Sequence, residues 1–162
     1  MISSAMMANS FWMKTVSLIS IFVLGNSITT GHCLWVKFKN KQYMLVDEPM
    51  TWMDAQSLCN SIDGFLATVS NEEEMRFIKS MTGVSTNIVW LGATDMFTEG
   101  RWVWIEDLKP MSYTTWYPGQ PNNGKKGNCL IGYHYNEFYW HDTGCYSKNR
   151  FICQRSVKRR KN

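Results

Sequence analysis

The sequence has little of the chemistry that enzymes use. It contains three histidines, at His32, His134 and His141, with no paired spacing that would suggest a zinc site. No Ser/His/Asp arrangement is recognisable, and no glycine-rich phosphate loop occurs. The net charge of +4 gives only modest attraction to anions. We therefore expect neither an enzyme nor a nucleic-acid-binding protein.

A long apolar run is also missing. The longest one, TVSLISIFVLG, follows Lys14 and is too short for a membrane span of about 20 residues. Small residues follow it, Gly25 and Ser27, spaced as in a cleavage site. We interpret residues 1–27 as a secretory signal peptide, so the protein should be secreted and extracellular, with no membrane span. The alternative, a buried N-terminal helix, is less favoured because the segment has no polar face.

The cysteine count is odd. In the oxidising compartment that secretion implies, the five cysteines should pair, and at least one must lack a partner within the chain. They are Cys33, Cys59, Cys129, Cys145 and Cys153. No Asn-x-Ser/Thr site occurs, so no N-linked glycan is expected.

Two helices are expected in the first half of the chain. In MTWMDAQSLCNSI, Thr51 can cap a helix that places Trp52, Ala55, Leu58 and Cys59 on one stripe. The segment SNEEEMRFIKSM opens with Ser70 and Glu73, which is the pattern of a capping box. It should turn its apolar residues inward and stop near a glycine: Met75, Ile78, Met81 and Gly83.

Strands are expected around these helices. The segment after Cys33 suggests an opening strand or hairpin, and FLATV, IVWLGAT, NCLIGYHY and NRFICQR suggest further strands. Between IVWLGAT and NCLIGYHY lie some thirty residues rich in Gly, Pro, Asn and Trp without a helical period, and a loop of that length is usually functional. The order of elements indicates an α+β fold. Residues 155–162 form a basic tail, which we interpret as a solvated end, with contact to an anionic surface as the alternative.

Several ordered motifs in residues 33–154 resemble the C-type lectin-like domain. They are WMDAQSLC at 52–59, FLATVSNEEE at 65–74, WLGATD at 90–95, EGRWVWIED at 99–107, YTTWYPGQPNN at 113–123, WHD at 140–142 and the closing FICQ. The resemblance implies two helices packed on short antiparallel sheets, a long binding loop and two disulfides, Cys59–Cys153 and Cys129–Cys145. It leaves Cys33 unpaired, because Gln42 stands where some members have its partner. The two alternatives for Cys33 are a link between two chains in a homodimer and a buried or capped thiol. It also implies that Trp90, Trp102, Trp104 and Phe151 belong to the core.

The resemblance further implies calcium as cofactor, bound beside the long loop. Gln120, Asn122 and Asp142 match three ligand positions of the principal site, whereas Gly127 stands where a glutamate ligand is usual and His141 replaces an asparagine. Only one anionic ligand survives, and Lys125 and Lys126 add positive charge to the same loop. Because affinity in such sites follows ligand charge, we expect weak calcium binding or none. Replacing Gly127 by Glu and His141 by Asn should then raise it.

An auxiliary calcium site of the family has its counterpart here. Asp95 and Glu99 match its acidic positions, and Asn123 and Asn128 stand where acids are frequent. The alternative interpretation, equally weighted, is that Asp95 and Glu99 only cap and solubilise a turn.

The expected function follows from this loop. The resemblance implies a secreted lectin that binds glycans or glycoproteins, with innate recognition as its expected role. The expected binding residues are Gln120, Asn122, His141, Asp142 and Trp116. The triplet Gln120-Pro121-Asn122 mixes the family's mannose-type and galactose-type patterns, so the sugar preference is not predicted. The alternative is a calcium-independent lectin-like module that binds a protein or surface ligand, since this fold hosts many ligands.

Overall fold

The computed structural model describes residues 34–83, 88–134 and 137–157. The expected signal peptide at 1–27, Cys33 and the end of the basic tail lie outside these residues. Within them, no helix is long and apolar enough to cross a bilayer.

The described residues form two helices and eight strands. The helices are α1 (Trp52–Ser61) and α2 (Glu72–Thr82), with a short 3₁₀ turn, η1 (Gly124–Lys126). The strands are β1 (Val36–Phe38), β2 (Lys41–Met50), β3 (Phe65–Leu66), β4 (Ile88–Thr94), β5 (Val103–Trp104), β6 (Cys129–His134), β7 (Phe138–Thr143) and β8 (Asn149–Ser156). The strands β5 and β7 were not predicted from the sequence.

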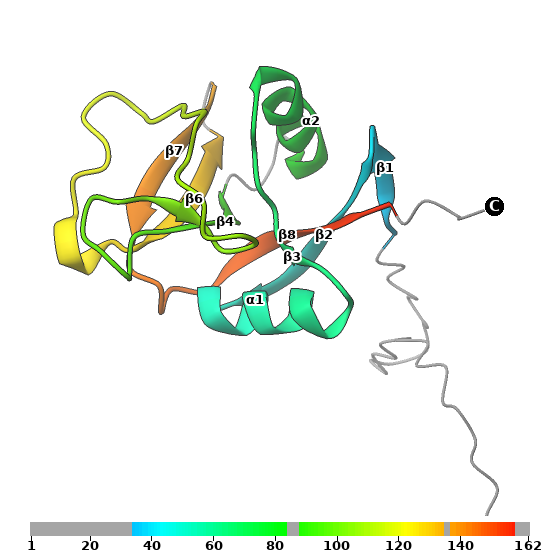
Figure 1. Ribbon diagram of the computed structural model, residues 1–162, viewed down its shortest axis with the longest axis horizontal. Coiled ribbons are helices and arrows are strands. Elements are labelled where there is room, and N and C mark those ends of the chain that lie inside the picture. The colour runs from blue at the N-terminus through cyan, green and yellow to red at the C-terminus, as the bar shows by residue number, and fades with distance from the viewer. Residues whose placement is uncertain (1–33, 84–87, 135–136, 158–162) are drawn as a thin grey trace, which may run out of the picture. The chain divides into compact units, whose positions relative to one another are not determined.

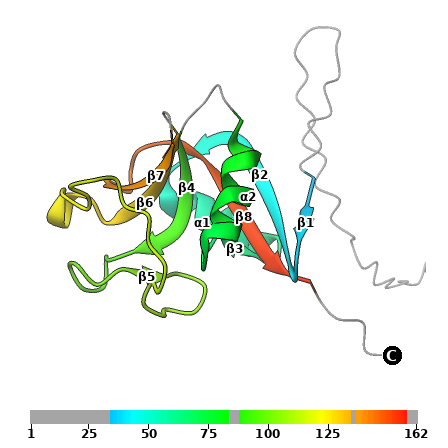
Figure 2. The same cartoon turned by 90° about the horizontal axis from the view of Figure 1, so that it is seen from above.

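The strands form one mixed sheet. Its order is β1-β2-β8-β4-β6-β7, with β3 attached to β8 and β5 attached to β4. All pairs are antiparallel except β4 and β8, so the expected antiparallel sheets are a single sheet with one parallel pair. Both views place β6, β7 and the long loop at the end of the domain away from β1 (Figures 1 and 2).

The helices begin at side-chain caps. Thr51 caps α1 as predicted, because its hydroxyl accepts the backbone N–H of Asp54 at 3.2 Å. The cap of α2 is displaced by one residue from the prediction. Asn71 accepts the N–H groups of Glu73 and Glu74, and Glu74 instead of Glu73 reaches back to the N–H of Ser70 at 2.8 Å. The physical reason is that the short Asn amide satisfies two free donors of the first turn at once.

The sheet has an apolar cluster on each face. Alternate residues of β8 serve different clusters, with Ile152 in one and Phe151 in the other. The first cluster includes Met75 and Ile78 of α2, and the second includes Trp52 of α1. The two helices therefore cover opposite faces, as Figure 1 shows. The four predicted core aromatics are buried: Trp90, Trp102, Trp104 and Phe151.

Both expected disulfides are present. Cys59 is bonded to Cys153, across 94 positions, and this bridge ties α1 to β8. Cys129 is bonded to Cys145, across 16 positions, and this bridge closes the β6–β7 region. Loop-closure entropy makes these bridges worth about 5 and about 3 kcal/mol.

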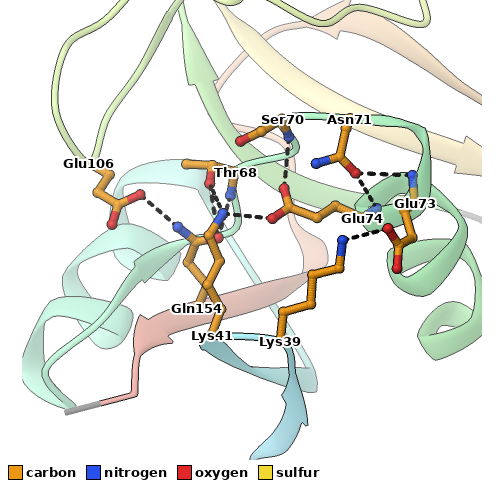
Figure 3. A network of polar contacts seen from close by, with 9 residues as sticks. All are labelled: Lys39, Lys41, Thr68, Ser70, Asn71, Glu73, Glu74, Glu106 and Gln154. Atoms are coloured by element: carbon orange, nitrogen blue, oxygen red, sulfur yellow. Dashed lines mark hydrogen bonds and ion pairs between the residues drawn. The ribbon is translucent and has the colours of Figure 1, made fainter. Parts of the chain in front are cut away.

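A polar network crosses the domain between α2 and the sheet (Figure 3). Lys41 Nζ lies 3.1 Å from the buried Glu74 carboxylate and donates to the Thr68 hydroxyl at 3.1 Å. Gln154 accepts the N–H of Thr68 at 2.9 Å and donates to Glu106 at 2.7 Å. The network joins β2, β8, the segment before α2 and the loop after β5, so it holds the scaffold from which the long loop departs.

Candidate functional site

The long loop is anchored to the sheet edge by backbone hydrogen bonds. Trp140 in β7 donates to Thr115 O at 2.9 Å and accepts from Tyr117 N at 3.0 Å, so residues 115–117 run beside β7. A turn follows, in which Gln120 N donates to Tyr117 O at 2.8 Å. The Gln120–Pro121 peptide is cis.

Asp142 fastens the tip of this loop. Its side chain is buried, with 3% of the residue exposed. One carboxylate oxygen accepts the N–H of Asn122 at 2.9 Å and the other accepts the N–H of Asn123 at 2.7 Å. The Asn123 amide also donates to Asp142, to the backbone carbonyl at 2.7 Å and to the carboxylate at 3.1 Å. The carboxylate is therefore directed at the loop backbone.

Gly127 packs directly against this carboxylate. A Cβ atom at Gly127 would lie 2.6 Å from Asp142 Oδ2 and 2.4 Å from Asn123 Cβ. Contacts below 3.0 Å require the neighbours to move. Any side chain at this position, the glutamate of the family pattern included, would displace the Asp142 carboxylate.

The principal set of residues offers a calcium ion few free oxygens. Both Asp142 oxygens are engaged with N–H groups, and His141 offers nitrogen where oxygen is preferred. Gln120 is the exception, because its amide oxygen is buried without a hydrogen-bond partner. In the part of the chain that the structure describes, no three His, Cys, Asp or Glu side chains gather around a possible metal position.

The auxiliary set fits a cation better. The Oδ1 atoms of Asp95 and Asn128 are both buried and unpartnered in the structure, and the two residues adjoin through a hydrogen bond from Asp95 N to Asn128 O at 3.3 Å. A Cβ atom at Gly124 would lie 3.9 Å from the carboxylate of Glu99, which places Glu99 beside the same loop. The other Asp95 oxygen accepts the N–H of Gly100 at 2.9 Å. Unpaired buried oxygens are costly without a cation or a donor to satisfy them.

Of the remaining predicted residues, Trp116 is partly buried against the first apolar cluster. It packs against the aromatic core, with its ring centroid 5.0 Å from that of Trp102 and 6.1 Å from that of Trp140. His141 lies on the face of β7 opposite to Trp140 and Asp142. Partial burial there lowers the pKa of its imidazole despite the nearby Asp142 carboxylate.

His141 belongs to a group of rings that the sequence did not identify as a unit. Tyr117 stacks on His141, with ring centroids 5.2 Å apart and 17° between the planes, and meets the edge of Tyr139 at 5.6 Å. Tyr133 meets His141 at 5.6 Å. We call Tyr117, Tyr133, Tyr139 and His141 the aromatic face. The alternation in FYWHDT would have indicated it, had this segment been interpreted as a strand.

A cavity of about 210 Å³ borders the aromatic face between α2 and β7. Tyr139 and Thr115 line it together with charged side chains of α2 and the start of β7. Two ion pairs bring those charges together, Arg76 with Glu72 at 3.3 Å and Lys79 with Glu137 at 3.0 Å.

Glu72, which lines the cavity, also accepts a hydrogen bond from the long loop. The Tyr113 hydroxyl donates to Glu72 at 2.7 Å. This hydrogen bond, followed by that from Arg76, lowers the pKa of the Glu72 carboxyl, while burial and the same contact raise the pKa of Tyr113 to about 12.

Known proteins resemble this chain in both sequence and fold. Residues 48–155 match the family model described as the lectin C-type domain. Perlucin from Haliotis laevigata is 36% identical over 112 residues, which cover 65% of this chain and 70% of perlucin.

Two solved structures are also similar. The carbohydrate-recognition domain of the mouse scavenger receptor C-type lectin is 30% identical, with a TM-score of 0.70, over 77% of this chain and 95% of that one. A calcium-independent type II antifreeze protein is 27% identical, with a TM-score of 0.70, over 76% of this chain and 92% of that one. With its two disulfides, its mixed sheet and its match over residues 48–155, the chain belongs to the C-type lectin domain family.

Proposed function

We propose that this protein is a secreted carbohydrate-binding lectin whose long loop is ordered, and binds sugar, without a calcium ion at the principal position. The observation that carries the proposal is the Asp142 carboxylate, both of whose oxygens accept backbone N–H groups of the loop. In this arrangement the hydrogen bonds supply the order that a bound ion would otherwise give to the loop. Carbohydrate binding is supported by membership of the lectin family and by the half-exposed ring of Tyr117 beside the loop.

Calcium, in this proposal, binds at the auxiliary set. Asp95, Glu99 and Asn128 would hold it, whereas the Asn123 amide is bonded to Asp142. Two carboxylates balance the ion's charge there, and the ion would satisfy the unpaired oxygens of Asp95 and Asn128. Its contribution is to hold the side chains of Asp95, Glu99 and Asn128 in place, and it does not require contact with the sugar.

A glycan array tests the proposal. The protein secreted by cells that express the full chain is applied in calcium and in chelator. We expect glycan signals that chelator leaves within about two-fold of their calcium values. Signals abolished by chelator would contradict calcium-free recognition, and a blank array in both conditions would contradict carbohydrate binding.

A second candidate is a calcium-independent module that binds a protein or a surface. It is favoured by large exposed apolar side chains outside residues 113–128, among them Phe97, which is 64% exposed, and Leu108, which is 55% exposed. The similarity to a calcium-independent antifreeze protein is compatible with it. A blank glycan array, followed by binding to a surface or protein that Phe97→Ser abolishes, would establish this candidate instead.

The remaining parts of the proposal concern the N-terminal region and biological context. Residues 1–27 direct secretion, Cys33 links two chains as a homodimer, and the protein takes part in innate recognition. Electrophoresis of the secreted protein without reducing agent tests the Cys33 link. A dimer band that Cys33→Ser removes is expected, and a monomer alone would contradict it.

A further inference from the structure

The aromatic face has the form of a ligand platform. Alternation along β7 directs Phe138, Trp140 and Asp142 into the protein, where all are buried, and leaves Tyr139 and His141 on the other side. In the adjoining strand β6, Tyr133 pairs with Tyr139 and therefore shares that side. Tyr117 lies over this surface with 48% of the residue exposed, although its ring already contacts two others.

The rings are held in place before any ligand arrives. The Tyr117 backbone is bonded to Trp140 O at 3.0 Å, and its ring stacks on His141 at 5.2 Å. Tyrosine has few rotatable bonds, so a fixed ring loses little conformational entropy when it binds a ligand. An immobile and partly exposed aromatic surface is well suited to stacking against another flat or apolar surface.

The neighbouring cavity supplies the complementary polar groups. It shares Tyr139 with the aromatic face, so a ligand on the rings can extend into it. The two ion pairs leave its four charged groups balanced in sign: Glu72 with Arg76, and Glu137 with Lys79. A surface of balanced charge favours neither an anion nor a cation, while carboxylates accept and Arg or Lys donate hydrogen bonds to hydroxyls.

From this juxtaposition we infer that the aromatic face and the adjoining cavity form a calcium-independent binding site for an uncharged saccharide. The C–H side of one sugar ring stacks on Tyr117 and Tyr139, and hydroxyls of that ring or the next one bond in the cavity to Arg76 and Glu137. The cavity volume of about 210 Å³ suits a single sugar ring and is too small for a folded partner. The inference rests on the proposed carbohydrate function and assigns it a site beside the Gln120–Asn122 loop.

The test uses saccharide titrations in chelator, monitored by NMR of the tyrosine and histidine rings. The protein is the secreted full-chain product with ¹³C-labelled Tyr and His, and four uncharged probes are added: methyl β-galactoside, methyl α-mannoside, cellotriose and chitotriose. We expect at least one probe to shift the ring signals of Tyr117 and His141. The inference is overturned if none of the four shifts them.

Variants separate this site from other binding modes. Tyr117→Ala should weaken binding of the responding probe about five- to ten-fold, as is usual for a central aromatic contact, whereas Tyr117→Phe keeps the ring and should retain affinity. Arg76→Met keeps the aliphatic length and should weaken binding about five-fold. The matched control is Tyr146→Ala, a highly exposed tyrosine outside the aromatic face, which should bind as the unaltered protein does.

The outcomes distinguish the inference from the proposed function. Retained glycan-array binding together with an unaffected Tyr117→Ala variant would overturn the inference and leave the lectin function standing. A blank array with no ring shifts would remove both. A heparin hexasaccharide that binds better than every uncharged probe would also overturn the inference, because it would place recognition at cationic groups such as Lys125 and Lys126.

Discussion

Asp142 Oδ2 accepts the backbone N–H of Asn123 at 2.7 Å, across 19 positions of the chain. This bond and its companion from Asn122 join the tip of the long loop to the sheet edge. A carboxylate that accepts several backbone donors in a buried site makes strong, charge-assisted hydrogen bonds. The two hydrogen bonds to Asp142 therefore hold the loop in place without a bound ion.

Replacing Asp142 by Asn should destabilise the protein by about 2 kcal/mol, because a buried ionised acceptor is lost and an amide N–H₂ faces two donors. Urea unfolding measures the change. Asp107→Asn is the matched control, since that carboxylate is exposed and pairs with the exposed Lys109, and it should change stability by less than about 0.5 kcal/mol. Equal effects of the two substitutions would contradict the structural role of Asp142.

Replacing Gly127 by Glu together with His141 by Asn should not create a calcium site. From the sequence alone the pair was expected to raise calcium affinity. The structure reverses that expectation, because a Cβ at Gly127 would meet the Asp142 carboxylate at 2.6 Å. Calorimetric calcium titration should show no added binding, and unfolding should show a loss of stability.

Gly127→Ala provides the control for this steric argument. It adds only the Cβ, so it should already cost most of the stability that Glu costs. If the Glu/Asn pair instead gained a calcium site of micromolar affinity with unchanged stability, the loop would have to reopen far more easily than its packing indicates.

The fold was predictable from the sequence because the patterns that indicate it lie within short segments of the chain. Core tryptophans, helix caps and glycines stand in ordered motifs, and Gly92 shows why such a glycine is needed, since a Cβ there would lie 2.5 Å from Leu66 O. The site was less predictable because it depends on where side chains point. Asp142 was expected to be a metal ligand, and no sequence pattern states that its oxygens turn to the N–H groups of Asn122 and Asn123. Trp116 was expected to bind ligand, whereas its ring packs on Trp102 and Trp140.

Stability should fall as the pH is lowered from about 7 towards 5, and His141 should account for part of the fall. Burial lowers the pKa of His141 below its ordinary value of 6.5, so the unfolded chain takes up the proton more readily than the folded one. Stability is therefore complete above pH 6.5 and is lost as the pH falls through the folded-state pKa.

The measurement is urea unfolding at several pH values for the unaltered protein and His141→Gln. The pH slope between 7 and 5 should be smaller in the variant. The lowered pKa of Glu72 acts in a separate window, since stability from it is lost only as the pH falls below about its ordinary value of 4.5. An identical slope in both proteins would show that His141 titrates alike when folded and unfolded.

Replacing Asp95 by Asn should abolish calcium binding, whereas Asp142→Asn should leave it within about three-fold. Asp95 carries a buried, unpaired carboxylate oxygen, and its removal takes away one of the two charges of the auxiliary set. Calorimetric titration of calcium into the metal-free variants distinguishes them. Loss of calcium binding in Asp142→Asn with retention in Asp95→Asn would assign the ion to the principal position instead.

The most direct test of the central claim is amide hydrogen exchange at Asn122 and Asn123 in chelator. Because Asp142 accepts both N–H groups without help from an ion, these amides should be protected at least about ten-fold over the unfolded rate, and calcium should add little. Asp142→Asn should remove the protection. Amides that exchange freely in chelator and become protected only when calcium is added would contradict the account, since the loop would then depend on the metal.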